Sequence, residues 1–270
     1  MKTGYHAVYS KDFFDGIDDA RKYGFDFVQF DLGVPKFFLN ELTNENLKDI
    51  KTYASDKNIA ITFHAPGDNV SLFCDYPIIR KGVLDEFSLI LEKANKLNAR
   101  HITFHAGNYS CFKKSGTKSD DSNISYYEQT LYDNIKHLTD RCGNVIACME
   151  NFMWDKVSRN AVKRLIDDGN ALYLTLDTAK LYSDATTETI IKDDYELLVQ
   201  YKDHIREMHL HDMNKEFKSH QTVGTGTIDF KLFKQFLNNN VYLNFEVRPV
   251  EAAKVSKDNL LKLWEYNFTV

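Results

Sequence analysis

Short β-like runs alternate with amphipathic segments from one end of this 270-residue chain to the other. The apolar runs are predicted to be strands, and the segments between them carry apolar residues at helical spacing. The predicted strands cover residues 5–9, 25–32, 59–64, 101–105, 145–150, 171–177, 205–212 and 241–246. The predicted helices cover residues 11–23, 43–56, 77–97, 124–141, 157–168, 189–201, 230–238 and 257–265.

Eight strand–helix units in a chain of this length favour an α/β fold, the (β/α)8 TIM barrel. No composition shift, proline-rich linker or low-complexity tract divides the chain, so we expect a single domain over residues 1–270. The alternative is an open, doubly wound sheet, but no G-x-G-x-x-G follows the first strand. In a TIM barrel, catalytic residues lie at the carboxyl ends of the strands.

Capping signals indicate where the first two helices begin and end. Ser10 is expected to cap the helix over 11–23, and Gly24 is expected to end it. Thr43 is the expected N-cap of the helix over 43–56.

Composition limits the partners and the compartment. The chain is 43% hydrophobic and 27% charged, with a net charge of −5 and no basic block, so nucleic acid is an unlikely partner. The four cysteines form neither a C-x-x-C nor a disulfide framework. No signal peptide or membrane-length apolar run is present, which favours a cytoplasmic protein without a membrane partner. The oligomeric state stays open, a homo-oligomer included.

Six successive predicted strands, from the third to the eighth, end in residue types that bind metal ions. These residues are His64, His105, Glu150, Asp177, His209 with His211, and Glu246. Three carboxylates converging at one end of a barrel would repel one another unless a cation lay between them. The sequence therefore predicts a divalent metal site. Carboxylate ligands with one imidazole suit Mn²⁺, Mg²⁺ or Co²⁺, and Zn²⁺ also tolerates them.

The expected ligands of this ion are Glu150, Asp177, His209 and Glu246. His209 is preferred over His211 because the residue nearer the loop is available to contact substrate, and the reverse choice stays open. The polar loop over 108–123 contains glycine and follows the fourth strand. It is expected to be a lid or binding loop, with a surface excursion as the alternative.

Seven short motifs, in this order along the chain, resemble those of the xylose isomerase-like TIM-barrel superfamily. They are Phe63-His-Ala-Pro66, Phe104-His-Ala-Gly107, Met149-Glu-Asn151, Leu176-Asp-Thr-Ala-Lys180, Met208-His-Leu-His-Asp212, Val223-Gly-Thr-Gly226 and Phe245-Glu-Val-Arg248. That superfamily contains sugar and sugar-phosphate isomerases and epimerases, and also endonuclease IV. The motifs cover most of the chain and are specific for the superfamily rather than for a substrate.

The resemblance implies a Glu-Asp-His-Glu metal quartet on the four ligands already chosen. It also implies that His64 and His105 lie in the pocket, where they bind a second metal ion in endonuclease-IV-like members and contact substrate in many isomerases. Two departures concern a third metal ion. Lys180 stands where the family usually has histidine, and Lys218-Ser-His220 stands where the endonuclease has Asp-x-His. A lysine ammonium repels a metal ion, which disfavours the three-metal phosphodiesterase.

The leading prediction is therefore a divalent-metal-dependent isomerase or epimerase of a sugar or sugar phosphate, acting through a metal-stabilised enediolate. As the resemblance implies, Glu150 and Glu246 would exchange the carbon-bound proton. A substrate phosphate or carboxylate would be held by basic residues, with a surface ion pair or a solvated lysine as the other interpretation of Arg248 and Lys180. The candidates are Lys180, His211, His220 and Arg248. Two alternatives remain, an endonuclease IV-like phosphodiesterase on abasic DNA and a catalytically silent sugar-binding barrel.

Overall fold

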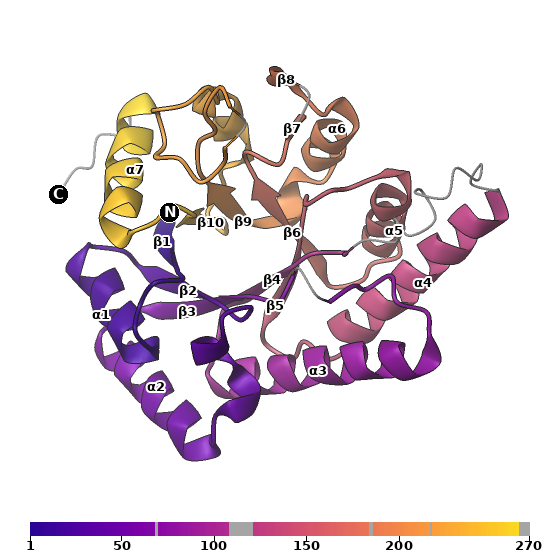
Figure 1. The fold of residues 1–270 in the computed structure, drawn as a ribbon, viewed down its shortest axis with the longest axis horizontal. Helices are drawn as coiled ribbons and strands as arrows, with labels where there is room; N and C mark the ends of the chain where they lie inside the picture. The colour runs from indigo at the N-terminus through magenta and orange to yellow at the C-terminus, as the bar shows by residue number, and fades with distance from the viewer. Residues whose placement is uncertain (68–69, 108–120, 184–185, 217, 265–270) are drawn as a thin grey trace.

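Eight parallel strands close into a barrel, as the sequence predicts (Figure 1). The computed structural model describes residues 1–67, 70–107, 121–183, 186–216 and 218–264. Around the barrel the strands follow the order β1-β10-β9-β6-β5-β4-β3-β2, so the first and last strands lie side by side. The strands are β1 Lys2–Ala7, β2 Phe27–Asp31, β3 Ala60–His64, β4 His101–Phe104, β5 Ile146–Glu150, β6 Leu172–Asp177, β9 Ile205–Leu210 and β10 Tyr242–Phe245.

Helices surround the ring of strands (Figure 1). The α-helices are α1 Phe13–Lys22, α2 Asn44–Asp56, α3 Pro77–Lys96, α4 Asp121–Thr139, α5 Lys156–Asp167, α6 Lys192–Gln200 and α7 Val250–Leu263. Short 3₁₀ helices are η1 Pro35–Phe37, η2 Leu39–Glu41, η4 Lys202–His204 and η5 Phe230–Phe236. A small antiparallel pair, β7 Tyr182–Ser183 and β8 Thr186–Ile190, follows β6. This alternation is the (β/α)8 TIM barrel.

Aromatic side chains fix the helices on the outside of the strands. The Phe13 ring on α1 lies 4.7 Å from Phe30 on β2 and 5.2 Å from Phe37 on η1. All three side chains are buried, and tilted aromatic pairs of this kind contribute about 0.5–1.5 kcal/mol each beyond the burial of their area. The contact holds α1 and the β2–α2 connection against the barrel wall.

Three predicted boundaries differ from the structure. Asp12, not Ser10, caps α1 by accepting a hydrogen bond from the Asp15 amide, because the Ser10 hydroxyl is engaged with Tyr5. The helix predicted over 189–201 is α6, which begins only at Lys192, after β8. The helix predicted over 257–265 is α7, which begins at Val250 directly after a proline at its N-cap. Thr43 caps α2 and Gly24 follows α1 with a φ of 70°, as predicted.

The segment predicted as a helix over 230–238 is the 3₁₀ helix η5. Its buried residues are Phe230, Phe233 and Phe236, which recur every third position. A 3₁₀ helix has three residues per turn, so this spacing places all three rings on one buried side.

The loop predicted over 108–123 falls mainly on residues 108–120, which lie outside the described residues. Asp121, in contrast, already begins α4. None of the helices in the described part of the chain is both long and apolar enough to cross a membrane.

Candidate metal centre

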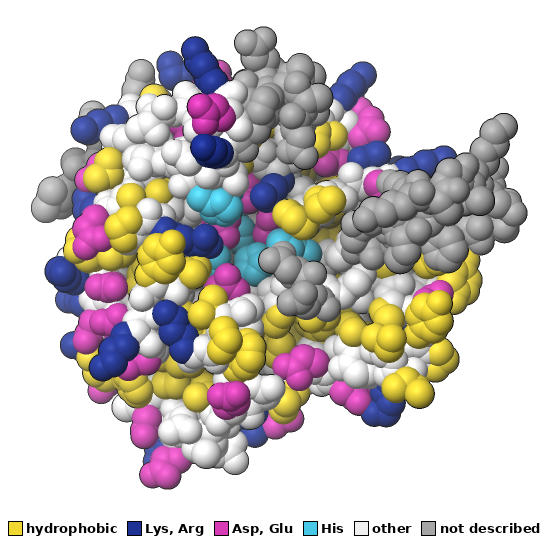
Figure 2. All heavy atoms as spheres, in the orientation of Figure 1, with side chains coloured by type: hydrophobic (Ala, Val, Ile, Leu, Met, Phe, Trp, Pro, Cys, Tyr) yellow, Lys and Arg dark blue, Asp and Glu magenta, His cyan; other side chains and the backbone are white. Residues whose placement is uncertain are grey.

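The carboxyl ends of the strands surround one hollow. Figure 2 shows histidine side chains gathered in it, with acidic and basic side chains around them. All four expected metal ligands are buried there, and Asp177 and His209 have no exposed surface. Parallel strands in register bring these ends together, since Asp177 on β6 pairs with His209 on β9.

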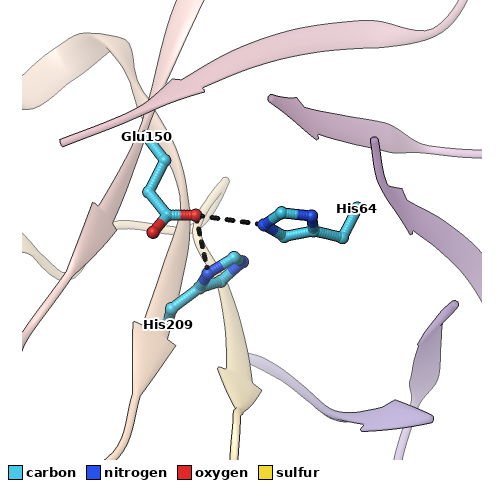
Figure 3. Close-up of side chains that lie close together, drawn as sticks. All are labelled: His64, Glu150 and His209. Carbon is cyan, nitrogen blue, oxygen red and sulfur yellow. Dashed lines mark hydrogen bonds and ion pairs between the residues drawn. The ribbon is translucent and has the colours of Figure 1, made fainter. Parts of the chain in front are cut away.

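The Glu150 carboxylate at the end of β5 lies at the centre of three imidazoles. Its Oε2 atom is 3.2 Å from His209 Nδ1 and 3.3 Å from both His64 Nε2 and His105 Nε2. Figure 3 shows the carboxylate pointing between His64 and His209. His64 Nδ1 donates a hydrogen bond to the Ala65 carbonyl at 2.9 Å, so when His64 is neutral its lone pair is on Nε2 and faces Glu150.

The Asp177 carboxylate at the end of β6 is held in a fixed orientation. Its Oδ1 atom accepts hydrogen bonds from the backbone amides of Ala179 and Lys180 at 2.8 and 3.0 Å. His211 Nδ1 accepts the backbone N–H of His220, so the His211 proton is on Nε2 and points at Asp177 Oδ2, 3.0 Å away. Both nitrogens of His211 are therefore engaged.

The Glu246 carboxylate after β10 faces the same hollow from the opposite side. Its Oε2 atom is 3.8 Å from His209 Nδ1, 3.5 Å from His211 Nε2 and 3.6 Å from His220 Nε2. Its Oε1 atom is 2.9 Å from Nδ1 of His6, a buried residue of β1.

Two residues of this site were missed in the sequence. His6 Nε2 lies 3.6 Å from Asp31 Oδ2, and Asp31 is the last residue of β2. Both belong to strand runs that the sequence predicted, and Asp31 is the next-to-last residue of its predicted run. Extending the rule of polar strand ends from six strands to eight would have found Asp31, but not His6, which is the second residue of its predicted run.

Electrostatics keep Glu150 and Glu246 ionised. Burial alone would raise the pKa of Glu150, but the imidazoles of His105 and His209 outweigh burial and hold that pKa well below its usual range. Burial is outweighed in the same way at Glu246, whose pKa is lowered well below its usual range by His209 and His6. Conversely, burial would lower the pKa of His209, yet the charges of Glu246 and Glu150 raise it to about 10. The Glu246 and Glu150 carboxylates therefore stabilise positive charge at the His209 ring.

The donor set fits a divalent cation. His209 Nδ1 is buried among carboxylates and, within the described residues, makes ion-pair contacts with them but no hydrogen bond of good geometry. Ligand atoms of Asp177, His209 and Glu246 all lie within 4.8 Å of one another, and so do those of His64, Glu150 and His209. An imidazole nitrogen surrounded by carboxylate oxygens is a ligand arrangement for Mn²⁺, Co²⁺ or Zn²⁺.

A stack of side chains places the Lys180 ammonium group beside the same site. The Phe152 ring lies parallel to His105 at 4.1 Å, and Lys180 Nζ lies 5.0 Å from the centre of the Phe152 ring. Arg248 is half-buried with its Nη2 atom 3.2 Å from His6 Nδ1. Within the described part of the chain, neither Lys180 nor Arg248 forms an ion pair with a carboxylate. Both cations are therefore available to an anionic group.

A recess of about 410 Å³ opens beside His64 and His105 toward the β2–α2 connection. Apolar side chains form much of its wall, among them Val34, Phe38 and Ile90. The recess extends the hollow away from the expected metal ligands.

The loop after β9 is organised by Asp212, a fully buried residue. Its carboxylate accepts four backbone N–H groups, those of Met213, Gly224, Gly226 and Ile228, at 2.8–3.1 Å. A Cβ atom at Gly226 would lie 2.3 Å from Asp212 Oδ1, so only glycine fits. The glycine-rich motif thus folds around one carboxylate and supports the loop that carries His220.

Comparisons with known proteins agree with the fold. The chain is 27% identical over 229 residues, 83% of its length and 84% of the other, to the uncharacterized protein MJ1614 of Methanocaldococcus jannaschii. A D-tagatose 3-epimerase-like protein matches the structure with a TM-score of 0.76 at 16% identity, over 98% of this chain and 97% of the other. The IolI protein, solved with a bound zinc atom, matches with a TM-score of 0.74 at 15% identity, over 100% of both chains.

These structural likenesses establish the fold, and the family follows from a sequence match. The family model for the xylose isomerase-like TIM barrel matches residues 17–262. The chain therefore belongs to the xylose isomerase-like TIM barrel family.

Proposed function

We propose that this protein is a divalent-metal-dependent isomerase or epimerase of a sugar or sugar phosphate. The observation that carries the proposal is the placement of two ionised carboxylates, Glu150 and Glu246, on either side of His209 Nδ1, at 3.2 and 3.8 Å. Removing a proton from a carbon beside a carbonyl and returning one to the opposite face needs two such groups, one on each side, whereas return to the neighbouring carbon on the same face can use one of them.

The ion would be held by Glu150, Asp177, His209 and Glu246, and when bound it supplies Lewis-acid stabilisation of the charge that develops on substrate oxygens. The hydrogen bonds at both nitrogens of His211 support His209 as the imidazole ligand. His211 then orients Asp177 through its Nε2 proton, as a residue behind a metal ligand commonly does.

Glu150 and Glu246 would carry the proton transfers. Each has its Oε2 atom near His209. Glu150 Oε1 is then available to a substrate carbon, whereas Glu246 Oε1 also lies 2.9 Å from His6 Nδ1. Because the two carboxylates approach from β5 and β10, on different sides of the barrel, one can remove a proton and the other can deliver one.

The remaining polar residues would bind and orient the substrate. Lys180, His220 and Arg248 suit a phosphate, a carboxylate or several hydroxyls, and the apolar recess suits the part of the substrate away from the reacting carbon. His64 and His105 would contact substrate oxygens or hold a second ion together with Glu150.

The test is exchange of a carbon-bound proton. Wild-type protein loaded with Mn²⁺ is incubated in D₂O with a panel of ketoses, keto-polyols and their phosphates, and deuterium at the carbon beside the carbonyl is measured by mass spectrometry. We expect incorporation with one substrate class and its loss in Glu150→Gln and Glu246→Gln. Glu92→Gln, an exposed carboxylate on α3, is the control. Metal-loaded protein that binds sugars without any exchange would instead be a sugar-binding barrel.

The competing function is phosphodiester cleavage at abasic sites. It is favoured by two further ligand groups, His64 with Glu150 and His211 with His220 and Glu246. It is opposed by Lys180, which faces Phe152 where a third ion would need a ligand, and by Lys218, which is exposed and pairs with Glu216. We expect no appreciable incision of abasic duplex DNA with zinc. Efficient zinc-dependent incision that disappears in Glu150→Gln would replace the isomerase with the nuclease.

A further inference from the structure

A layer of polar side chains fills the barrel directly beneath the candidate metal centre. All of its members are fully buried, whereas bulky branched residues usually fill this space in TIM barrels. The layer consists of Gln29, Thr103, Thr175, Glu207 and Asn244.

Two chains of hydrogen bonds converge on Glu207. In one, the Thr103 hydroxyl donates to Glu207 Oε2 at 3.1 Å and therefore accepts from Thr175 at 2.7 Å. In the other, Asn244 Nδ2 donates to Gln29 Oε1 at 2.6 Å, and Gln29 Nε2 donates to Glu207 Oε1 at 2.8 Å. Both oxygens of Glu207 accept hydrogen bonds, which is the arrangement of an ionised carboxylate.

The same layer contacts the rear of His209. His209 Nε2 is 3.3 Å from Gln29 Nε2 and 3.8 Å from Glu207 Oε1. An amide nitrogen only donates, so it can contribute a proton to Nε2 but cannot accept one. Among these neighbours of Nε2, Glu207 alone can accept a proton from it.

The two contacts favour opposite tautomers. If Nε2 accepts from Gln29, the imidazole proton is on Nδ1, the atom that faces Glu150 and Glu246, and Nδ1 cannot bind a cation. If Nε2 carries the proton, that proton faces Glu207 Oε1, which lies within ion-pair distance but beyond hydrogen-bond distance at 3.8 Å, and the Nδ1 lone pair faces the carboxylates and is free for a metal ion.

We infer that Glu207 is a positioning residue that holds His209 as the Nε2–H tautomer and so prepares Nδ1 to bind the metal ion. This role rests on the proposed metal site and assigns a purpose to a buried carboxylate that lies outside the ligand quartet. The hydrogen-bonded layer holds Glu207 in place, and Glu207 holds the ligand.

The test compares divalent-ion affinity in three variants. Glu207→Gln keeps the shape of the side chain and removes the charged acceptor, and we expect the dissociation constant for Mn²⁺, measured by competition with a chelator, to rise about 10- to 100-fold. Glu207→Asp keeps the charge but withdraws the acceptor from His209, so its affinity should fall between. Thr62→Val is the matched control, because Thr62 pairs in register with Gln29 on the neighbouring strand and its buried hydroxyl has no hydrogen-bond partner among the described residues.

A second readout separates positioning from folding. In the Zn²⁺-loaded protein, the His209 Nε2 proton should give a downfield, slowly exchanging resonance that is absent in His209→Asn and moves upfield in Glu207→Gln. A Glu207→Gln variant that melts earlier but binds Mn²⁺ within twofold of wild type would overturn the role and leave Glu207 a structural residue. Wild-type protein that binds no divalent ion would remove the proposed metal site and this role together, whereas equal binding by wild type and Glu207→Gln removes this role alone.

Discussion

At the scale of single residues, the distinguishing feature of this barrel is a set of charged side chains buried in its interior. Carboxylates at Asp177, Glu207 and Glu246 are buried, and each meets imidazoles, amides or hydroxyls instead of water. Burying a charge is unfavourable unless it is compensated. At the carboxyl ends of the strands, this compensation comes from a set of histidines around a space suited to a cation.

Removing single ligands should empty the metal site without unfolding the protein. Glu150→Gln, Asp177→Asn, His209→Asn and Glu246→Gln each remove one donor, and we expect each to weaken metal binding and abolish activity. Elemental analysis of the purified variants, with circular dichroism to check the fold, measures this. One ion per wild-type chain supports the isomerase, three ions support the nuclease, and full metal content in all four variants would refute the ligand assignment.

His101, at the opposite end of the barrel, should make the fold sensitive to acid. Burial, together with Arg206 and Arg100, lowers the pKa of His101 from 6.5 to about 3. The unfolded chain therefore binds this proton below pH 6.5 while the folded chain stays neutral, and stability falls by up to about 1.4 kcal/mol per pH unit until pH 3. His101→Phe should retain the edge-on contact with Tyr242 and lose this part of the slope.

Urea unfolding of wild type and His101→Phe at pH 7, 5.5 and 4 measures the difference. As pH falls, the free energy of unfolding should decrease more steeply for wild type than for His101→Phe. Parallel curves over this range would show that His101 is protonated in the folded protein.

At the scale of elements, local sequence set most helices, and contacts between segments set the loops. Asp12 and Thr43 cap α1 and α2 from within their own segments. The loop between β9 and η5 instead depends on one buried carboxylate, Asp212, which accepts amides up to 16 residues away. Its stability therefore rests on a contact that local propensity does not describe.

Asp212→Asn should destabilise the protein by disrupting that loop. The amide group of asparagine turns a donor toward two of the backbone N–H groups that Asp212 now accepts. Hydrogen bonds to a charged group contribute about 1.5–3 kcal/mol each, so we expect a loss of roughly 2–4 kcal/mol in the free energy of unfolding.

Asp229→Asn is the control, because Asp229 is exposed and accepts one N–H, that of Lys231, at the start of η5. Chemical denaturation measures both variants, and limited proteolysis tests the loop directly. Equal stabilities for Asp212→Asn and Asp229→Asn would show that the buried carboxylate does not organise the loop.

At the scale of the whole molecule, the candidate metal centre joins distant parts of the chain. Its proposed ligands come from β5, β6, β9 and β10, and its supporting histidines from β1 and β3. An ion that binds only when these strands are assembled stabilises the folded barrel over the unfolded chain.

Metal loading should therefore raise the melting temperature. At an ion concentration 100 times the dissociation constant the gain is about 2.7 kcal/mol, which corresponds to a rise of roughly 5 °C or more for a protein of this size. Differential scanning calorimetry with and without EDTA measures it, and Glu150→Gln should show little change. A rise of the same size in that variant would place the stabilising ion elsewhere.

The sequence alone determined the barrel and the residues at the ends of six of its strands. Eight apolar runs separated by helical periodicity admit few folds, and a polar residue that ends such a run must lie at the carboxyl rim. This reasoning found Glu150, Asp177, His209 and Glu246, and it brought them together before any contact was known. It did not find that η5 is a 3₁₀ helix, although the spacing of Phe230, Phe233 and Phe236 carries that signal.

Only the tertiary structure decided which atoms meet. Period two places Glu207, His209 and His211 on one face of a strand but does not distinguish a ligand from its supports. That distinction comes from neighbours outside the strand, because the amide of His220, in the following loop, occupies His211 Nδ1 and Gln29 on β2 reaches the rear of His209. His6 likewise gains its importance only because closing the barrel sets β1 against β10, beside Glu246. Strand ends are encoded locally, whereas hydrogen-bond partners, tautomers and burial arise from segments far apart in the chain.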